Sequence, residues 1–206
     1  MSNINIENLQ TGDILLFTRS SGNGLFFDLF DSVISFWSSS PFVHCAFVLK
    51  DPEFIHPTLK GLFIWESGWE YGDKDPQDNK SKLGVQITPI YEYLRNSPYS
   101  SVFVRKFEKG EISQCTLLQI HQKVYNKPYD TNIFDWLGAA VRDTSEKRQT
   151  DRFWCSAFVS YILVHLDFIG DVNWDLTRPQ DLSSMTDYPF IHFLQNCTYG
   201  KDERIL

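Results

Sequence analysis

The stretch DRFWCSAFVSYIL, residues 151–163, places a cysteine at the head of what reads as a buried helix. From Phe153 onward nearly every residue is apolar, and this pattern predicts a helix that is covered on most sides. Asp151 or Thr150 is a suitable N-cap, which would put Cys155 in or near the first turn. Free backbone N–H groups and the positive end of the helix dipole favour a thiolate there, and the thiolate is the nucleophilic form of cysteine.

Two interpretations of Cys155 are open at this point. Free cysteine is among the most buried residue types, so Cys155 can be one more small apolar side chain of the core. A nucleophilic cysteine, in contrast, usually needs a base, which is most often histidine. The candidates for that base are the five histidines of the chain: His44, His56, His121, His165 and His192.

The histidines differ in how well they could reach Cys155 and be held there. His165 is excluded, because it lies ten residues along the same predicted helix, or about 15 Å away by helical rise. His56 lies in a proline-flanked loop that would hold a base poorly. His121 is on a predicted helix and His192 is near the C-terminus, and the sequence excludes neither.

His44 lies inside the β-rich run FVHCAFVL, residues 42–49, on the strand face that it shares with Ala46 and Val48. A strand fixes an imidazole well, and the small side chain of Ala46 leaves room beside the ring. The alternative is a core histidine whose ring nitrogens are satisfied by its neighbours. Cys45 points to the opposite strand face, so the adjacent pair is not expected to share a metal ion.

Glu66 could orient the imidazole of His44. It ends the run GLFIWES, residues 61–67, which reads as the neighbouring strand, and it shares a face with Leu62 and Ile64. A carboxylate that ends an apolar run is notable, although the end of a strand is also an ordinary place for a solvated acidic side chain.

Composition and charge narrow the class of protein. The 206 residues suggest a single domain, and 42% hydrophobic with 22% charged residues is the composition of a globular chain with a core. A formal net charge of −7 argues against binding to nucleic acid and to anionic membranes. No apolar run is long enough for stable membrane insertion, and the opening MSNINIENLQ lacks the pattern of a signal peptide. We therefore expect a cytoplasmic protein whose four cysteines are reduced and too widely spaced for a zinc knuckle.

Periodicity and turn residues predict a chain of mixed α+β structure. Predicted strands cover residues 13–17, 42–49, 61–67, 84–88 and 101–107, and predicted helices cover 22–37, 89–96, 112–126, 134–141 and a segment that begins near Phe153. A long polar loop is expected at 68–81 and a turn at 178–182. The aromatic stripe of the 22–37 helix is best explained as core, with a lipid-facing or substrate-facing surface as the alternative.

Taken together and in this order, the segments resemble the permuted NlpC-type cysteine hydrolases. The matching segments are GDILLF, HCAFV, WES, KPYD, FWCSAFV and RPQDL, which span the chain from Gly12 to Leu182. These hydrolases are circularly permuted relatives of papain, and their superfamily includes lecithin retinol acyltransferase-like enzymes and a poxviral branch. His44 precedes Cys155 here, as the permuted order requires. The resemblance implies one permuted papain-like domain over residues 1–206, with an antiparallel sheet packed against helices that include the cysteine helix.

The resemblance also implies roles for individual residues. Cys155 would be the nucleophile, His44 the base and Glu66 the third member of a triad, while Asp13 and Pro179 would be structural or line the site. The implied activity is that of a cysteine peptidase or amidase, which cleaves a peptide or isopeptide bond through a thioester and needs no cofactor and no metal.

Two alternatives stay open. One is a lipid acyltransferase or thioesterase of the same superfamily, with an acyl lipid as substrate in place of a peptide. The other is a non-enzymatic binding protein that uses the same cleft. The segments 22–37 and 68–81 are not part of a minimal core of this family, so the substrate cannot be transferred from relatives.

Overall fold

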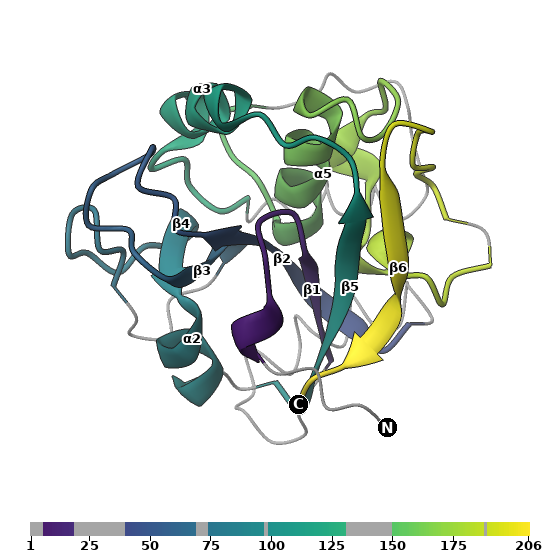
Figure 1. Ribbon diagram of the computed structural model, residues 1–206, viewed down its shortest axis with the longest axis horizontal. Coiled ribbons are helices and arrows are strands. Elements are labelled where there is room, and N and C mark those ends of the chain that lie inside the picture. The colour runs from purple at the N-terminus through teal and green to yellow at the C-terminus, as the bar shows by residue number, and fades with distance from the viewer. Residues whose placement is uncertain (1–5, 19–39, 69–73, 97–98, 131–149, 188) are drawn as a thin grey trace.

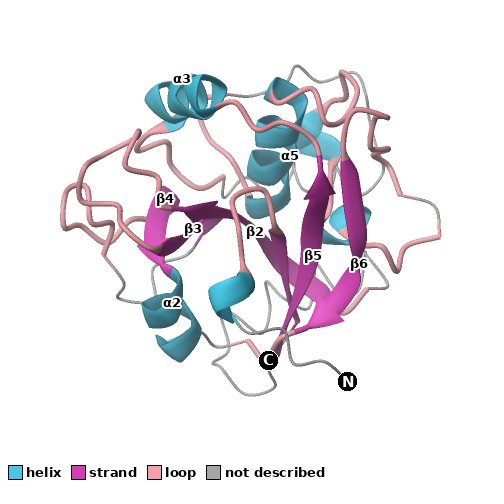
Figure 2. Cartoon of the chain, viewed as in Figure 1, coloured by secondary structure: helices cyan, strands magenta, loops and turns pink. Residues whose placement is uncertain are grey.

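The computed structural model describes residues 6–18, 40–68, 74–96, 99–130, 150–187 and 189–206. They form an α+β fold, in which a six-stranded antiparallel sheet has the strand order β4-β3-β2-β1-β5-β6 (Figure 1). The strands are β1 (Ile14–Thr18), β2 (Phe42–Lys50), β3 (Leu62–Gly68), β4 (Gly84–Pro89), β5 (Ser101–Lys109) and β6 (Thr198–Arg204). The helices are α2 (Ile90–Asn96), α3 (Gln114–Val124) and α5 (Cys155–His165), with 3-10 turns η1 (Ile6–Asn8), η2 (Trp174–Leu176) and η3 (Pro179–Leu182) (Figure 2).

Both faces of the central strands are buried, which explains why they read as continuous apolar runs. On β2, Cys45 and Phe47 point into the larger hydrophobic cluster, which contains α5. Ala46 and Val48 point into a second cluster on the opposite face, which includes side chains of α2. Eight of the nine residues of β2 are buried, so any polar side chain on this strand must find its partners inside the protein.

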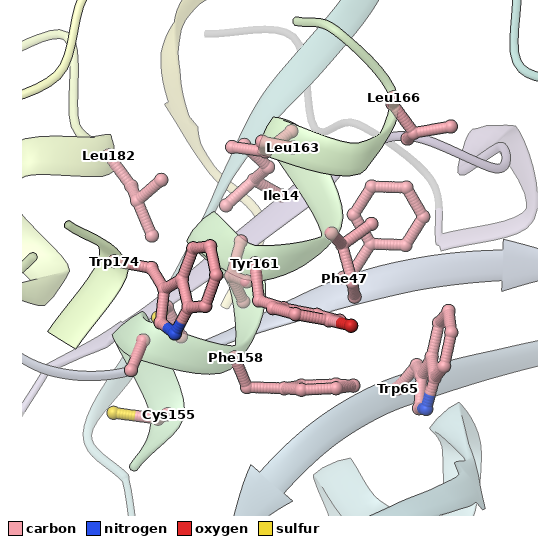
Figure 3. Packing of buried hydrophobic residues seen from close by; sticks show 14 of the residues in the cluster. Ile14, Phe47, Trp65, Cys155, Phe158, Tyr161, Leu163, Leu166, Trp174 and Leu182 are labelled. Atoms are coloured by element: carbon pink, nitrogen blue, oxygen red, sulfur yellow. The ribbon is translucent and has the colours of Figure 1, made fainter. Parts of the chain in front are cut away.

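The helix α5 packs against the middle of the sheet. All its residues from Cys155 to Leu163 are buried, which is the behaviour of a helix that is apolar on every side. Phe158 packs edge-on against Trp65 of β3, with ring centroids 5.3 Å apart. Figure 3 shows Cys155 at one end of α5 and Leu166 beyond the other end, with the aromatic side chains between them.

The strands β2 and β3 stay paired over only part of their length. Their register runs from Lys50↔Leu62 to Phe47↔Trp65. Beyond that point β2 continues along β1 as far as Phe42, and β3 continues along β4 as far as Gly68. The two strands are therefore unpaired from Ala46 and Glu66 onward, a stretch that includes His44.

The predicted elements agree with the structure where it describes them, with three corrections. The N-cap of α5 is Trp154, not Asp151 or Thr150. Phe153 is held extended by a bridge to Tyr129, so the helix cannot start earlier. Gly68, predicted as loop, is the last residue of β3.

The third correction is β6, which the sequence analysis missed. Its sequence TYGKDER has no apolar alternation, because β6 pairs only with β5 and is an edge strand with mostly exposed side chains. The predicted helices at 22–37 and 134–141 lie outside the described residues, as do residues 69–73 of the predicted loop. None of the helices in the described ranges has the length and hydropathy that crossing a bilayer requires.

Asp13 ties the start of β1 to β5. Its fully buried carboxylate accepts the backbone N–H of Gln10 and that of Phe107, both at 2.9 Å, and pairs with the Lys106 ammonium at 2.5 Å. Gly12, the preceding residue, has φ +101°, and a Cβ there would meet Ile112 at 2.5 Å. The structure therefore gives the Gly-Asp pair a role in closing the sheet.

The substitution Asp13→Ala should destabilise the fold without any direct effect on the cysteine site. It leaves two backbone N–H groups without their acceptor and removes the partner of Lys106, so we expect the free energy of unfolding to fall by about 2–4 kcal/mol. Urea denaturation measures this change. Glu53→Ala is the matched control, because Glu53 pairs with Lys60 at 3.3 Å through side chains that are 51% and 73% exposed, and it should cost less than about 0.5 kcal/mol. Equal effects of the two substitutions would contradict the role of Asp13.

Candidate active site

Cys155 is the first residue of α5, at a helix end that no side chain caps. Trp154 is the N-cap residue, and its side chain makes no capping hydrogen bond. The first hydrogen bond of the helix is donated by the Phe158 N–H to the Trp154 carbonyl, at 3.0 Å. The N–H groups of Cys155 and of the two residues after it therefore precede the helical hydrogen-bond ladder. Together with the helix dipole they stabilise negative charge at this position.

His44 of β2 connects Cys155 to a buried carboxylate. The His44 Nε2 atom lies 2.5 Å from Oε2 of Glu66. The other ring nitrogen, Nδ1, is not used by this contact, and the ring also interacts with the Cys155 sulfur. The ring is stacked on Tyr99, at 5.6 Å between centroids and 4° between planes, and Phe17 contacts it at 5.4 Å. These aromatic rings fix the plane of the imidazole and favour its charged form.

Glu66 of β3 is fully buried and has a second partner. The Gln86 side-chain amide, from the residue directly opposite on β4, donates to Oε1 of Glu66 at 3.1 Å. Gly68 lies over the carboxyl group on the same strand face, and a Cβ there would come within 2.7 Å of its Cδ and Oε1 atoms. The carboxylate is therefore held from three directions, by His44, by Gln86 and by the backbone of Gly68.

Charges in this cluster reinforce one another. Burial by itself lowers the pKa of His44, but the nearby Cys155 sulfur and the Glu66 carboxylate outweigh burial and raise the pKa from 6.5 to about 10. A hydrogen bond from the Cys45 thiol lowers the pKa of Cys155, burial opposes it, and the charge of His44 then helps to hold the pKa well below the usual range. Both shifts favour a thiolate–imidazolium pair over two neutral groups.

The separation of β2 and β3 explains how residues 44 and 45 can both reach Cys155. Neighbouring residues on a strand point to opposite faces, and Cys45 faces α5 while His44 faces the other side. β2 is no longer paired with β3 at this level, and the sulfur at the start of α5 interacts with both side chains. The structure thus brings Cys155, His44 and Glu66 together.

The other histidines have different surroundings. Burial lowers the pKa of His121 to about 4, and its ring packs against Trp65 and Tyr125. His165 donates from Nδ1 to the Tyr161 carbonyl at 2.8 Å, at the far end of α5. His192 is exposed, and His56 bonds to the neighbouring hydroxyl of Thr58.

Sequence reasoning missed several residues of this cluster. Gln86 carried a weak signal, because it is a polar residue inside the apolar run GVQIT. No pattern in the sequence indicated Tyr99, Gly68 or the contact of Cys45, because these depend on strand register and on packing. Pro179 is the first residue of η3. Within the described residues, no group of three or more histidine, cysteine, aspartate or glutamate side chains is arranged to hold a metal ion.

Comparisons with known proteins leave the function open. No protein-family model matches the chain, and no curated protein matches it. Among solved structures, the chain is similar to the crystal structure of the metalloprotein yiiX from Escherichia coli O157:H7, DUF1105. The two share 17% sequence identity with a TM-score of 0.49, over 94% of this chain and 97% of that one.

The reactivity of Cys155 should depend on pH in the way its surroundings dictate. A lowered pKa keeps the sulfur as thiolate, so alkylation of Cys155 by iodoacetamide should stay fast from neutral pH downward and fall only below that depressed pKa. In His44→Ala the pH below which alkylation falls should rise toward about 8.5, the pKa of an ordinary thiol. Mass spectrometry of the alkylated protein in a Cys115→Ser background, which removes the exposed cysteine, measures both rates. The same pH dependence of the alkylation rate in both proteins would contradict the ion pair.

The substitution Gly68→Ala should weaken the interaction between Cys155 and His44 without replacing a side chain of either residue. The new Cβ displaces the Glu66 carboxyl group from His44 and Gln86. The pH below which alkylation of Cys155 falls should therefore rise, as in His44→Ala but by less. Gly170→Ala is the matched control, because a Cβ at Gly170 meets nothing within 4 Å. Equal alkylation profiles for the two glycine variants would show that the position of Glu66 does not matter.

Proposed function

We propose that the protein is a cysteine hydrolase that cleaves an amide bond, in a peptide or an isopeptide, by way of a thioester. The observation that carries this proposal is the arrangement of Cys155, His44 and Glu66, in which a thiolate at an uncapped helix start lies beside an imidazolium backed by a buried carboxylate. An inert core cysteine needs none of these features.

The first half of the reaction uses the ion pair as it stands. The Cys155 thiolate attacks the carbonyl carbon of the substrate, and the carbonyl oxygen becomes an oxyanion that accepts hydrogen bonds from backbone N–H groups at the start of α5. The His44 imidazolium gives its Nδ1 proton to the leaving amine as the C–N bond breaks. The amine departs, and the acyl group stays on Cys155 as a thioester.

The second half restores the ion pair. Neutral His44 takes a proton from water, the hydroxide attacks the thioester carbonyl, and Cys155 leaves as a thiolate beside the imidazolium. Throughout, Glu66 keeps Nε2 protonated and directs Nδ1 at the sulfur. Gln86 and Tyr99 act as positioning residues, through Glu66 and through the ring of His44.

The raised pKa of His44 supports an amide as the scissile bond. An amine is a poor leaving group unless it is protonated, and an imidazolium that keeps its proton up to a pH of about 10 is present for that step over the whole neutral range. The proposed permuted papain-like fold is supported by the antiparallel sheet, by α5 packed on β2 and β3, and by the order of His44 before Cys155.

Hydrolysis of a panel of fluorogenic acyl-amide peptides, together with an activity-based thiol probe, tests the proposal. Cys155→Ala should lower kcat/KM by roughly three orders of magnitude or more, and His44→Ala by a comparable factor, because the two groups act as a unit. His56→Ala is the matched control, since His56 lies outside the cluster. Activity should fall at low pH as Cys155 is protonated, and at high pH as His44 loses its proton near a pH of about 10.

Two other outcomes would overturn the proposal. Turnover of acyl lipids alone, with transfer to an alcohol or amine, would make the protein an acyltransferase of the same design. Probe labelling that persists in Cys155→Ala, or that falls on Cys115, would show that Cys155 is not the nucleophile.

A further inference from the structure

A serine next to Glu66 ties the end of β3 to the chain just before α5. The Ser67 side chain is fully buried, and its hydroxyl donates to the backbone carbonyl of Phe153 at 2.6 Å. Phe153 lies two residues before Cys155. The hydrogen bond therefore joins the strand that carries Glu66 to the segment that leads into the cysteine helix. The amide hydrolysis proposed above makes no chemical use of Ser67.

Glu66 and Ser67 point to opposite faces of β3, because successive side chains of a strand alternate. Glu66 contacts His44 at 2.5 Å on one face. Ser67 points to the other face, which Trp65 shares with the hydrophobic cluster that contains α5. Two consecutive residues of one strand thus hold the base directly and the approach to the nucleophile through Phe153.

The backbone of Phe153 is held from two directions. Its carbonyl accepts the Asp130 N–H at 3.0 Å as well as the Ser67 hydroxyl, and its N–H donates to the Pro128 carbonyl at 3.2 Å. Pro128 in turn bridges Gly84 of β4. The Ser67 hydroxyl is the donor that fixes Phe153 directly to β3.

The first turn of α5, which carries Cys155, is anchored on two sides instead of being capped by a side chain. The Ser156 hydroxyl holds it to the Thr177 carbonyl at 2.6 Å. Ser67 holds it to the sheet, through Phe153. The sheet side matters for chemistry because it carries the base, and a misplacement of about 1 Å between reacting groups costs up to roughly 100-fold in rate.

We propose that Ser67 is a positioning residue of the cysteine site, whose hydroxyl fixes the start of α5 against β3 and so sets the placement of Cys155 relative to the His44 ring that Glu66 holds. The inference rests on the proposed function, in which Cys155 and His44 act as a unit. Ser67 itself binds no substrate and transfers no proton in this role.

A buried hydrogen bond of this kind also stabilises the fold, so stability alone does not test the inference. Thr186 supplies the comparison, because its hydroxyl donates to the Gln180 carbonyl at the same distance of 2.6 Å. Loss of either hydroxyl takes a partner from a carbonyl and should lower the free energy of unfolding. The Ser67 hydroxyl should in addition change the chemistry of Cys155.

Three substitutions at one position isolate the hydroxyl. Ser67→Ala removes it, while Ser67→Thr and Ser67→Val add the same bulk and differ in that the threonine keeps the hydroxyl. Strain from the added volume is therefore common to the last two. Thr186→Val is the matched control. All are made in a Cys115→Ser background, and urea denaturation establishes that each is folded before kcat, KM and the pH dependence of Cys155 alkylation are measured.

Ser67→Ala and Ser67→Val should lower kcat about tenfold and change KM by less than about twofold, because the lost alignment belongs to the transition state. The interactions that lower the pKa of Cys155 come from Cys45 and His44 of β2. A displaced sulfur therefore has a higher pKa, and the pH below which alkylation falls should rise in the same two variants. Ser67→Thr and Thr186→Val should keep the kcat and the pH dependence of the unsubstituted protein.

Two results would overturn the inference. One is the same kcat and the same alkylation profile in Ser67→Val and Ser67→Thr. The other is a Ser67→Ala protein that, like Thr186→Val, loses stability and nothing else.

Failure of the proposed function gives a different pattern. A wild-type protein that hydrolyses no amide, but whose alkylation profile still separates Ser67→Val from Ser67→Thr, would refute the hydrolase and leave the positioning role. Amide hydrolysis that requires Cys155 and is equal in all the Ser67 variants would refute the positioning role and leave the hydrolase.

Discussion

The 2.5 Å contact between His44 and Glu66 is the interaction on which the rest of the site depends. A carboxylate that is fully buried is costly unless it is paired and hydrogen-bonded, and Glu66 meets both conditions through His44 and Gln86. Together with the Cys155 sulfur, Glu66 raises the pKa of His44, and His44 in turn adds to the influence of Cys45 in lowering the pKa of Cys155. The three groups therefore form one electrostatic unit, in which removal of any member leaves another buried charge without its partner.

The sheet makes room for this unit by ending one strand pairing early. Full pairing of β2 with β3 would extend their ladder past Phe47↔Trp65 to the level of His44 and Gly68. Instead the two strands pair with their outer neighbours, β1 and β4, at this level, and α5 packs against both strands. The hydrophobic clusters on both faces supply the burial that holds this arrangement and keeps its effective dielectric constant low.

The start of α5 lacks the capping side chain that a helix optimised for stability would have. Trp154 does not cap it, and the helix is anchored by other contacts: the Ser156 hydroxyl donates to the Thr177 carbonyl at 2.6 Å, and the Trp154 indole N–H donates to the same carbonyl at 3.4 Å. A departure from a local stability rule with compensation close by is typical of functional positions. Here the departure leaves backbone N–H groups next to a thiolate.

Local patterns in the sequence were enough to predict the main helices and strands. Apolar runs bounded by turn residues predicted β1 to β5, the near-total apolarity after Phe153 predicted α5, and the period of two placed His44 and Glu66 on defined strand faces. These features are readable because each follows from the conformation of one short segment. The edge strand β6 was not predicted, since a strand paired on one side only needs no apolar pattern.

Tertiary structure alone decided which distant residues meet. The opposition of Gln86 to Glu66 depends on the β3–β4 register, the stacking of Tyr99 on His44 depends on packing across the sheet, and the contact of Cys45 with Cys155 depends on where two strands part. Register and helix placement are set by burial summed over the whole chain, so no single segment encodes them. The sequence by itself determined a cysteine at a helix start and a histidine on a strand, and only the fold placed them in one buried cluster with a carboxylate.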